Sequence, residues 1–177
     1  MKQWWIIGAL VVVVALVAFV MVGRKPATPP AEEPAVTAVP TAPADPAETF
    51  LAANAKKEGW KATESGLQYS IEKPATDPAA VKPAQGSEVT VHYEGKLIDG
   101  TVFDSSYARN EPATFPLSNV IRGWQEGVPM MKVGEIWNFA IPPGLGYGSR
   151  DVGGGKIPAN SVLLFKVELL KAPTPAQ

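Results

Sequence analysis

Residues 91–170 decide the fold of this chain, and they contain VHYEGKLIDGTVFDSS (91–106), FPLSNVIRGWQEGV (115–128) and GYGSRDVGGGKIPANSVLLFKVELL (146–170). Short runs that alternate apolar and polar residues are separated by Gly, Pro, Asp and Asn, which is typical of strands joined by turns. Aromatic residues fall at strand ends and turns, with almost no groups suited to covalent catalysis among them. The stretch therefore indicates a pocket that works by shape.

The wider pattern predicts an α+β fold. We expect strands in the runs LQYSI (67–71), EVTVHYEGKL (88–97), VFDSS (102–106), EIWNFAI (135–141) and SVLLFKVELL (161–170). One short helix is expected at about Arg122 to Val128, because Gly123, Gly127 and Pro129 limit its length. The prediction is an antiparallel sheet of five or six strands, curled around that helix.

An uncharged apolar run, WWIIGALVVVVALVAFVMV, extends from Trp4 to Val22. Its length of about nineteen residues is close to that needed to cross a bilayer as a helix. Residues 1–25 are therefore predicted to be a transmembrane anchor, with a secretory signal as the alternative. Lys2 on one side and Arg24 and Lys25 on the other leave the orientation almost undecided by charge alone.

Residues 26–46 form a linker rich in Pro and Ala, which is too polar to build a packed core. Roughly twenty residues of extended polyproline chain could hold a domain up to about 60 Å from a membrane. Such a spacer favours a domain displayed on the periplasmic side of a bacterial inner membrane. A short helix is predicted over 47–60, with Asp45 as its cap and Gly59 at its end, and a folded domain over 61–177.

Composition excludes several classes of function. The 177 residues carry a formal net charge of −1, which argues against nucleic acid as a partner. The chain has no cysteine and one histidine, His92, so a thiolate nucleophile is excluded and a catalytic triad or metal site is not expected. The glycines at 144–148 and 153–155 are followed by a strand and lack the Lys-Ser or Lys-Thr pair of a phosphate-binding loop. No cofactor is expected.

The quoted segments closely resemble the FKBP family of peptidyl-prolyl cis/trans isomerases. A VHYEG strand, an FDSS turn, a VIRGW helix start, a GYG loop and an IPANSVLLFKVELL strand follow in the family's order. The resemblance implies a prolyl pocket with Trp124 as its floor and Tyr93, Phe103 and Phe165 as walls. It also implies that Asp104 is a polar group at the rim, and that the Ile121 backbone N–H and the Tyr147 hydroxyl donate hydrogen bonds to substrate carbonyls. Val120 and Ile157 would complete the lining, with Phe115 in partial contact.

The resemblance also implies proline-containing polypeptides as substrates, with isomerisation that needs no acid or base. Ala113 stands where relatives carry an aromatic wall residue, which should leave one side of the pocket open and weaken binding of a macrolide ligand. It also invites a rival hypothesis, a holdase chaperone or peptide-binding module with little turnover. Residues 47–74 resemble the joint before the catalytic domain of Mip-like members. Those members place a long dimerisation helix before the joint, where this chain has the anchor and the linker, so the oligomeric state stays open. Arg150 is interpreted as a solvated charge.

Overall fold

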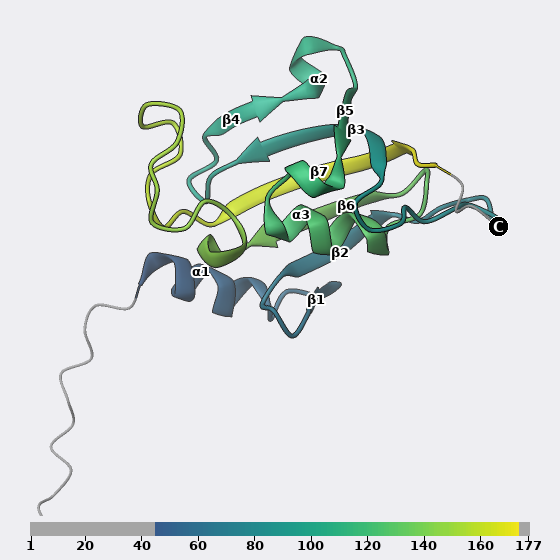
Figure 1. Ribbon diagram of the computed structural model, residues 1–177. Helices are drawn as coiled ribbons and strands as arrows, with labels where there is room; N and C mark the ends of the chain where they lie inside the picture. The colour runs from purple at the N-terminus through teal and green to yellow at the C-terminus, as the bar shows by residue number, and fades with distance from the viewer. Residues whose placement is uncertain (1–44, 174–177) are drawn as a thin grey trace, which may run out of the picture. The chain divides into compact units, whose positions relative to one another are not determined.

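A computed structural model of the chain describes residues 45–173 (Figure 1). The predicted anchor and nearly all of the predicted linker, residues 1–44, lie outside the described residues. Within residues 45–173, no helix is both long and apolar enough to span a membrane.

The described residues form one antiparallel sheet of seven strands, in the order β1-β2-β6-β7-β3-β4, with β5 also paired to β3. The strands are β1 (Trp60–Ala62), β2 (Gln68–Lys73), β3 (Glu88–Lys96), β4 (Val102–Ser105), β5 (Ala113–Pro116), β6 (Ile136–Ile141) and β7 (Leu163–Lys171). The antiparallel sheet is confirmed, but the expected count of five or six strands is wrong. The two strands that the sequence pattern did not predict are β1, which has three residues, and β5, which has four, follows Pro112 and ends at Pro116. Three residues are too few to show an alternating pattern, and prolines weaken the evidence for a strand.

Strand β3 organises the side of the sheet on which the site lies. Its residues 90–96 pair with β7 on one edge, while its other edge pairs first with β5 and then with β4. Val91 lies opposite Ala113, and Glu94 lies opposite Ser105. The chain that links β4 to β5 must therefore leave the sheet and return to the same strand, which gives room for a helix between them (Figure 1).

That link holds helix α2 (Ser106–Arg109), which the sequence did not predict. Ser105 caps it by accepting a hydrogen bond from the Ala108 N–H at 3.2 Å. Helix α3 (Arg122–Gly127) confirms the expected short helix to within one residue. The prediction of one helix in the sheet region is therefore incomplete, because a helix of a single turn leaves no periodic signal.

Helix α3 packs against the face of the sheet that carries the core. A Cβ atom on Gly123 would stand 2.6 Å from the Ile141 side chain, so only glycine allows this approach. Alternate residues of β3 and β7 point into the same core, among them Val91, Tyr93 and Val167. Because His92 lies between two of these residues, it faces the other side of the sheet, and Tyr93 takes the core side.

Helix α1 (Pro46–Asn54) precedes the sheet and begins as predicted, with Asp45 accepting a hydrogen bond from the Ala47 N–H at 2.9 Å. The predicted span of 47–60 is too long at its end. Trp60 pairs with Ser70 in β1, so the chain must leave the helix and turn over residues 55–59. Three short 3-10 turns complete the fold: η1 (Leu117–Asn119), η2 (Val128–Met130) and η3 (Pro143–Leu145).

Candidate functional site

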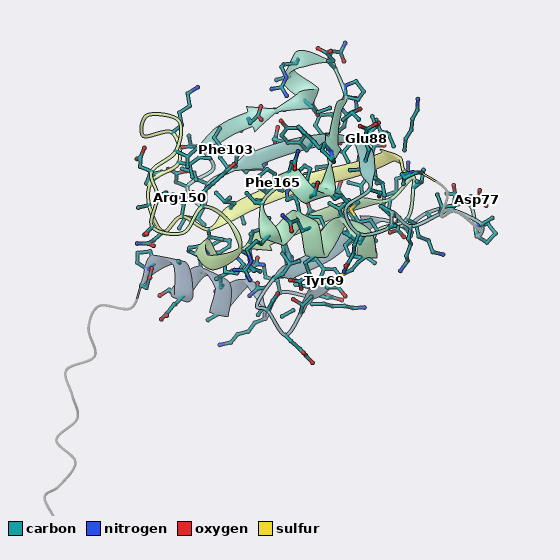
Figure 2. The ribbon with its side chains drawn as sticks, in the orientation of Figure 1. Tyr69, Asp77, Glu88, Phe103, Arg150 and Phe165 are labelled. Atoms are coloured by element: carbon teal, nitrogen blue, oxygen red, sulfur yellow. The ribbon has the colours of Figure 1, made fainter. Side chains whose placement is uncertain are left out.

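The structure brings all ten sequence-predicted site residues to one open cavity of about 810 Å³. The cavity lies where α3 begins, with strands of the sheet on one side and the loop between η3 and β7 on another. Its predicted members are Tyr93 (β3), Phe103 and Asp104 (β4), Phe115 (β5), Val120, Ile121 and Trp124 (at and before α3), Tyr147 and Ile157 (loop) and Phe165 (β7). Figure 2 labels two of them, Phe103 on β4 and Phe165 on β7, the two strands that flank β3.

The base of the cavity is an aromatic cluster centred on Trp124. The indole ring meets the rings of Tyr93, Phe115 and Phe165 edge-on, at 5.5, 6.1 and 5.3 Å between centroids. Phe103 in turn meets Phe165 edge-on at 5.5 Å. Edge-to-face contacts are the favoured geometry for aromatic pairs, and each adds about 0.5–1.5 kcal/mol beyond the area that it buries. The cluster therefore forms a fixed apolar surface.

One edge of the cavity carries a bonded polar group of three side chains. The Tyr93 hydroxyl donates a hydrogen bond to Asp104 Oδ2. Arg109 Nη1 donates to Asp104 Oδ1 at 2.5 Å, and Nη2 donates to the Tyr93 hydroxyl at 3.2 Å. Both oxygens of Asp104 are thus engaged within the protein. Arg109 was missed by the sequence analysis because it lies on α2, which was not predicted.

These contacts shift two pKa values in opposite directions. Burial raises the pKa of Tyr93, and the hydrogen bond to Asp104 adds to the effect. Burial alone would raise the pKa of Asp104, but the hydrogen bonds from Tyr93 and Arg109 outweigh it and lower that pKa below its usual value. Asp104 is therefore held as a carboxylate, and Tyr93 as a neutral phenol.

Three donors at the cavity have no partner among residues 45–173. The Ile121 N–H and the Tyr147 hydroxyl make no hydrogen bond there, and the buried Trp124 Nε1–H makes none either. A buried donor without a partner costs free energy, so native structures hold few of them. The Trp124 N–H is fully buried and so is not open to a ligand. Ile121 and Tyr147 are partly exposed and line the cavity, so their two free donors are suited to a ligand that brings carbonyl oxygens.

Other residues that line the cavity were not assigned to it from the sequence. They include Arg122, Arg150 and Lys156, as well as Asn119, Gly146, Val152 and Gly153. Arg150, interpreted above as a solvated charge, lies in the loop at the same end of the sheet as Phe103 (Figure 2). Exposed basic residues in a glycine-rich loop carry no sequence signal that separates them from ordinary surface charges.

Metal or imidazole chemistry finds no support in the described part of the chain. Within residues 45–173, no three His, Cys, Asp or Glu side chains are grouped closely enough to hold a metal ion. His92 lies outside the cavity, where its Nδ1 lies 3.0 Å from Ser106 Oγ and its ring stacks on Tyr107 at 4.8 Å. What the cavity offers is an apolar surface, a small polar edge and free donors.

Comparison with known proteins accounts for this arrangement. A family model described as FKBP-type peptidyl-prolyl cis-trans isomerase matches residues 79–170. The chain belongs to this family. A second model, described as the domain amino terminal to FKBP-type peptidyl-prolyl isomerase, matches residues 33–71 of this FKBP-type chain.

Curated members of the FKBP family are similar to the chain over about seven tenths of its length. It is 57% identical over 129 residues to the FKBP-type isomerase FkpA of Aeromonas hydrophila, which covers 73% of this chain and 46% of that relative. It is 52% identical over 122 residues to the FKBP-type 22 kDa isomerase of Escherichia coli, covering 69% and 57% of the two chains. The chain thus spans about half the length of these curated relatives.

Solved structures of FKBP-type proteins have the same fold. FkpA from Escherichia coli matches with a TM-score of 0.66 and 41% identity, over 73% of this chain and 59% of that one. A peptidyl-prolyl cis-trans isomerase from Pseudomonas syringae matches with a TM-score of 0.64 and 34% identity, over 71% of this chain and 89% of that one.

Proposed function

We propose that this chain is a peptidyl-prolyl cis/trans isomerase that acts on X-Pro bonds in polypeptides. The observation that carries the proposal is the aromatic cavity over Trp124, where, within the part of the chain that the structure describes, two donors are free and the only carboxylate, Asp104, is engaged by Tyr93 and Arg109. Rotation about an X-Pro bond breaks no covalent bond. Its barrier of about 18–20 kcal/mol arises from amide resonance, which is lost in the twisted state.

The cavity can lower that barrier in two ways. An apolar surface disfavours the charge-separated planar amide relative to the twisted amide, which carries less charge on oxygen. Donors arranged for the twisted geometry bind it more tightly than the planar form. An acceleration of about 10⁴-fold needs only about 5.5 kcal/mol, which desolvation and a few hydrogen bonds can supply.

The proposed roles come from the family resemblance, and the positions of the residues in the cavity support them. Trp124 is the floor under the proline ring, and Tyr93, Phe103 and Phe165 are walls, with Val120, Ile157 and part of Phe115 completing the apolar lining. The Ile121 N–H and the Tyr147 hydroxyl donate to substrate carbonyls. Asp104 lines the cavity, but its two carboxylate oxygens already accept hydrogen bonds from Tyr93 and Arg109. Its main role in the proposal is therefore to hold the Tyr93 wall in place.

The direct test is the cis-to-trans rate of short X-Pro peptides with the full chain in detergent, for the natural protein and for Tyr147→Phe. Loss of one substrate hydrogen bond should lower kcat/KM by about 2- to 10-fold. Tyr69→Phe is the matched control, because Tyr69 is half-buried on β2, stacks on Trp137 and lies outside the cavity. Equal rates for both variants would remove Tyr147 from its role.

A macrolide competitor extends the same assay. Inhibition of the catalysed rate would locate turnover in the aromatic cavity. We expect a weak effect, because Ala113 provides no aromatic side chain on its side and does not line the cavity. A folded protein that binds peptides but accelerates none of them would overturn the isomerase proposal in favour of a holdase or peptide-binding module.

The location of the protein is part of the proposal. We infer that residues 4–22 hold the chain in the inner membrane and that the linker displays the catalytic domain in the periplasm, where exported proteins fold. Support comes from the uncharged length of that segment and from the proline-rich composition of 26–46. One relative, 46% identical over 123 residues, is the outer membrane protein MIP of Legionella longbeachae, which supports a place in the cell envelope but not the inner membrane in particular.

Fractionation combined with protease treatment of spheroplasts tests this location. Full-length protein in the inner-membrane fraction, degraded by external protease, is the expected result. A mature chain that lacks the first residues by mass spectrometry would identify a cleaved signal instead. Protection from protease until the cells are lysed would put the domain on the cytoplasmic side.

A further inference from the structure

Three basic side chains line the cavity without belonging to its aromatic surface: Arg122, Arg150 and Lys156. All three are exposed. The one acidic residue among the residues that line the cavity is Asp104, and its carboxylate is already paired with Arg109. The mouth of the cavity therefore carries an excess of positive charge, although the whole chain has a formal net charge of −1.

None of these three cations has an ion-pair partner within residues 45–173. The ion pairs found there join other residues: Lys96 with Glu94, Arg109 with Asp104, and Lys166 with Glu72. Asp151, next to Arg150 in sequence, uses its Oδ1 to accept the Gly155 N–H at 2.8 Å within the loop. The three charges are thus available to a partner from outside.

Each cation is also close in the chain to a group that the proposed function assigns to substrate binding. Arg122 follows Ile121, and Lys156 precedes Ile157. Arg150 Nε donates to the carbonyl of Tyr147. A peptide whose proline lies over Trp124 and whose carbonyls meet these donors therefore has its neighbouring side chains within reach of positive charge, from the start of α3 and from the loop.

From these observations we propose that the site prefers X-Pro segments that carry a carboxylate within two residues of the proline. The inference rests on the proposed isomerase function and adds a substrate class to it. Ion pairs at an exposed rim are individually weak, and salt screens them. We therefore expect a glutamate peptide to exceed its glutamine isostere by about 3- to 10-fold in kcat/KM at low ionic strength.

The test compares peptides that differ only by Glu, Gln or Lys, placed either before or after the proline, with the full chain as enzyme. The expected order of kcat/KM is Glu, then Gln, then Lys. In roughly 0.5 M salt the Glu-to-Gln ratio should fall toward one, because the Debye length is then about 4 Å. Glutamine matches glutamate in size, so the ratio isolates charge.

A triple variant, Arg122→Gln, Arg150→Gln and Lys156→Gln, identifies the source of the preference. Its Glu-to-Gln ratio should fall to about one. The matched control removes the same number of positive charges elsewhere, by changing Lys61, Lys82 and Lys132 to Gln. These three lysines lie together beside Tyr69 and away from the cavity. The control should keep both the ratio and the activity of the natural chain.

The outcomes separate the two proposals. Turnover of all peptides with a Glu-to-Gln ratio near one would overturn the charge preference and leave the isomerase function standing. A ratio that survives in the rim triple variant, or that disappears in the control, would also overturn it. Absence of acceleration with every peptide would overturn the isomerase function and the preference together.

Discussion

Gly95 and Phe103 lie so close that a Cβ atom on residue 95 would stand 2.5 Å from the Phe103 ring. The same atom would lie 2.7 Å from the ring of Phe165. Real Cβ atoms do not tolerate such distances, so glycine here is a condition for the edge-to-face contact between the two rings. One residue of β3 without a side chain thereby sets the position of two cavity walls.

Gly95→Ala should therefore displace Phe103 and Phe165 and lower kcat/KM for X-Pro peptides by more than tenfold. We also expect a loss of about 1–3 kcal/mol in the free energy of unfolding, as is common when a packed region is overfilled. Steady-state kinetics and denaturant unfolding measure the two effects. Gly144→Ala is the control, because a Cβ atom there meets nothing within 4 Å. If Gly95→Ala were as active as Gly144→Ala, the Phe103 and Phe165 rings would be able to move without loss of activity, and the prediction would be wrong.

Trp124→Ala should damage both stability and activity. The indole is 4% exposed and supports three other rings, so its removal should cost about 3–5 kcal/mol in the free energy of unfolding. Trp137→Ala provides the comparison, because Trp137 is equally buried but lies outside the cavity. Per folded molecule, kcat/KM should collapse only in the Trp124 variant. Equal residual activity in both would refute the floor assignment.

The sequence predicted most of the sheet because its long strands bury alternate residues. Nine-residue strands such as β3 and β7 repeat the pattern often enough to be recognised. Helix α3 was predicted from its glycines and the following proline, since those residues limit a helix wherever it packs. The ten site residues came from the family resemblance, not from periodicity, because aromatic residues in isolation most often belong to a core.

What the sequence did not predict depends on contacts between distant parts of the chain. Strand β5 is defined by its pairing with β3, and the local sequence of its four residues does not indicate that pairing. Arg109 reaches Asp104 because the return from β4 to β5 forms a helical turn. Helix α1 ends at Asn54 because Trp60 must reach Ser70. Each of these features is tertiary, so local propensity cannot encode it.

The end of α1 is tied to the sheet by two buried amides, and this contact can be tested. Asn54 Nδ2 donates to Gln68 Oε1 at 2.9 Å, and Gln68 Nε2 donates to the Leu51 carbonyl at 2.9 Å. Asn54→Ala should lower the free energy of unfolding by about 1–3 kcal/mol, because it leaves the buried Gln68 oxygen without a donor. Because alanine is a better helix former than asparagine, a loss of stability in this variant comes from the lost contact and not from helix propensity.

A double variant, Asn54→Leu with Gln68→Leu, separates the hydrogen bonds from the packing. Replacing both partners by apolar groups avoids an unpaired buried group, so the pair should be less destabilising than the sum of the single changes. Thermal and denaturant unfolding of the four proteins completes the cycle. Strict additivity would mean that the two amides do not act together and that α1 is held by apolar contacts alone.

Asp104 should make stability depend on pH in the acid range. Its pKa in the folded protein lies below the ordinary value, which is about 3.9 in an unfolded chain. Above the ordinary value the carboxylate is ionised in both states, and its stabilising contacts are fully present. As the pH falls toward the folded pKa, the unfolded chain takes up the proton first, so the contribution is progressively lost. The free energy of unfolding should therefore drop below about pH 4 more steeply in the natural chain than in Asp104→Asn.

Urea unfolding at a series of pH values between 7 and 3 measures how far the free energies of unfolding of the natural chain and Asp104→Asn differ. This difference should be constant near neutral pH and shrink in acid. In an Arg109→Gln background the same difference should be smaller at neutral pH, because one of the two donors that lower the pKa of Asp104 is gone. Parallel pH profiles for the natural chain and Asp104→Asn would mean that the bonds from Tyr93 and Arg109 do not favour the ionised carboxyl, and that Asp104 holds the Tyr93 wall without a contribution from its charge.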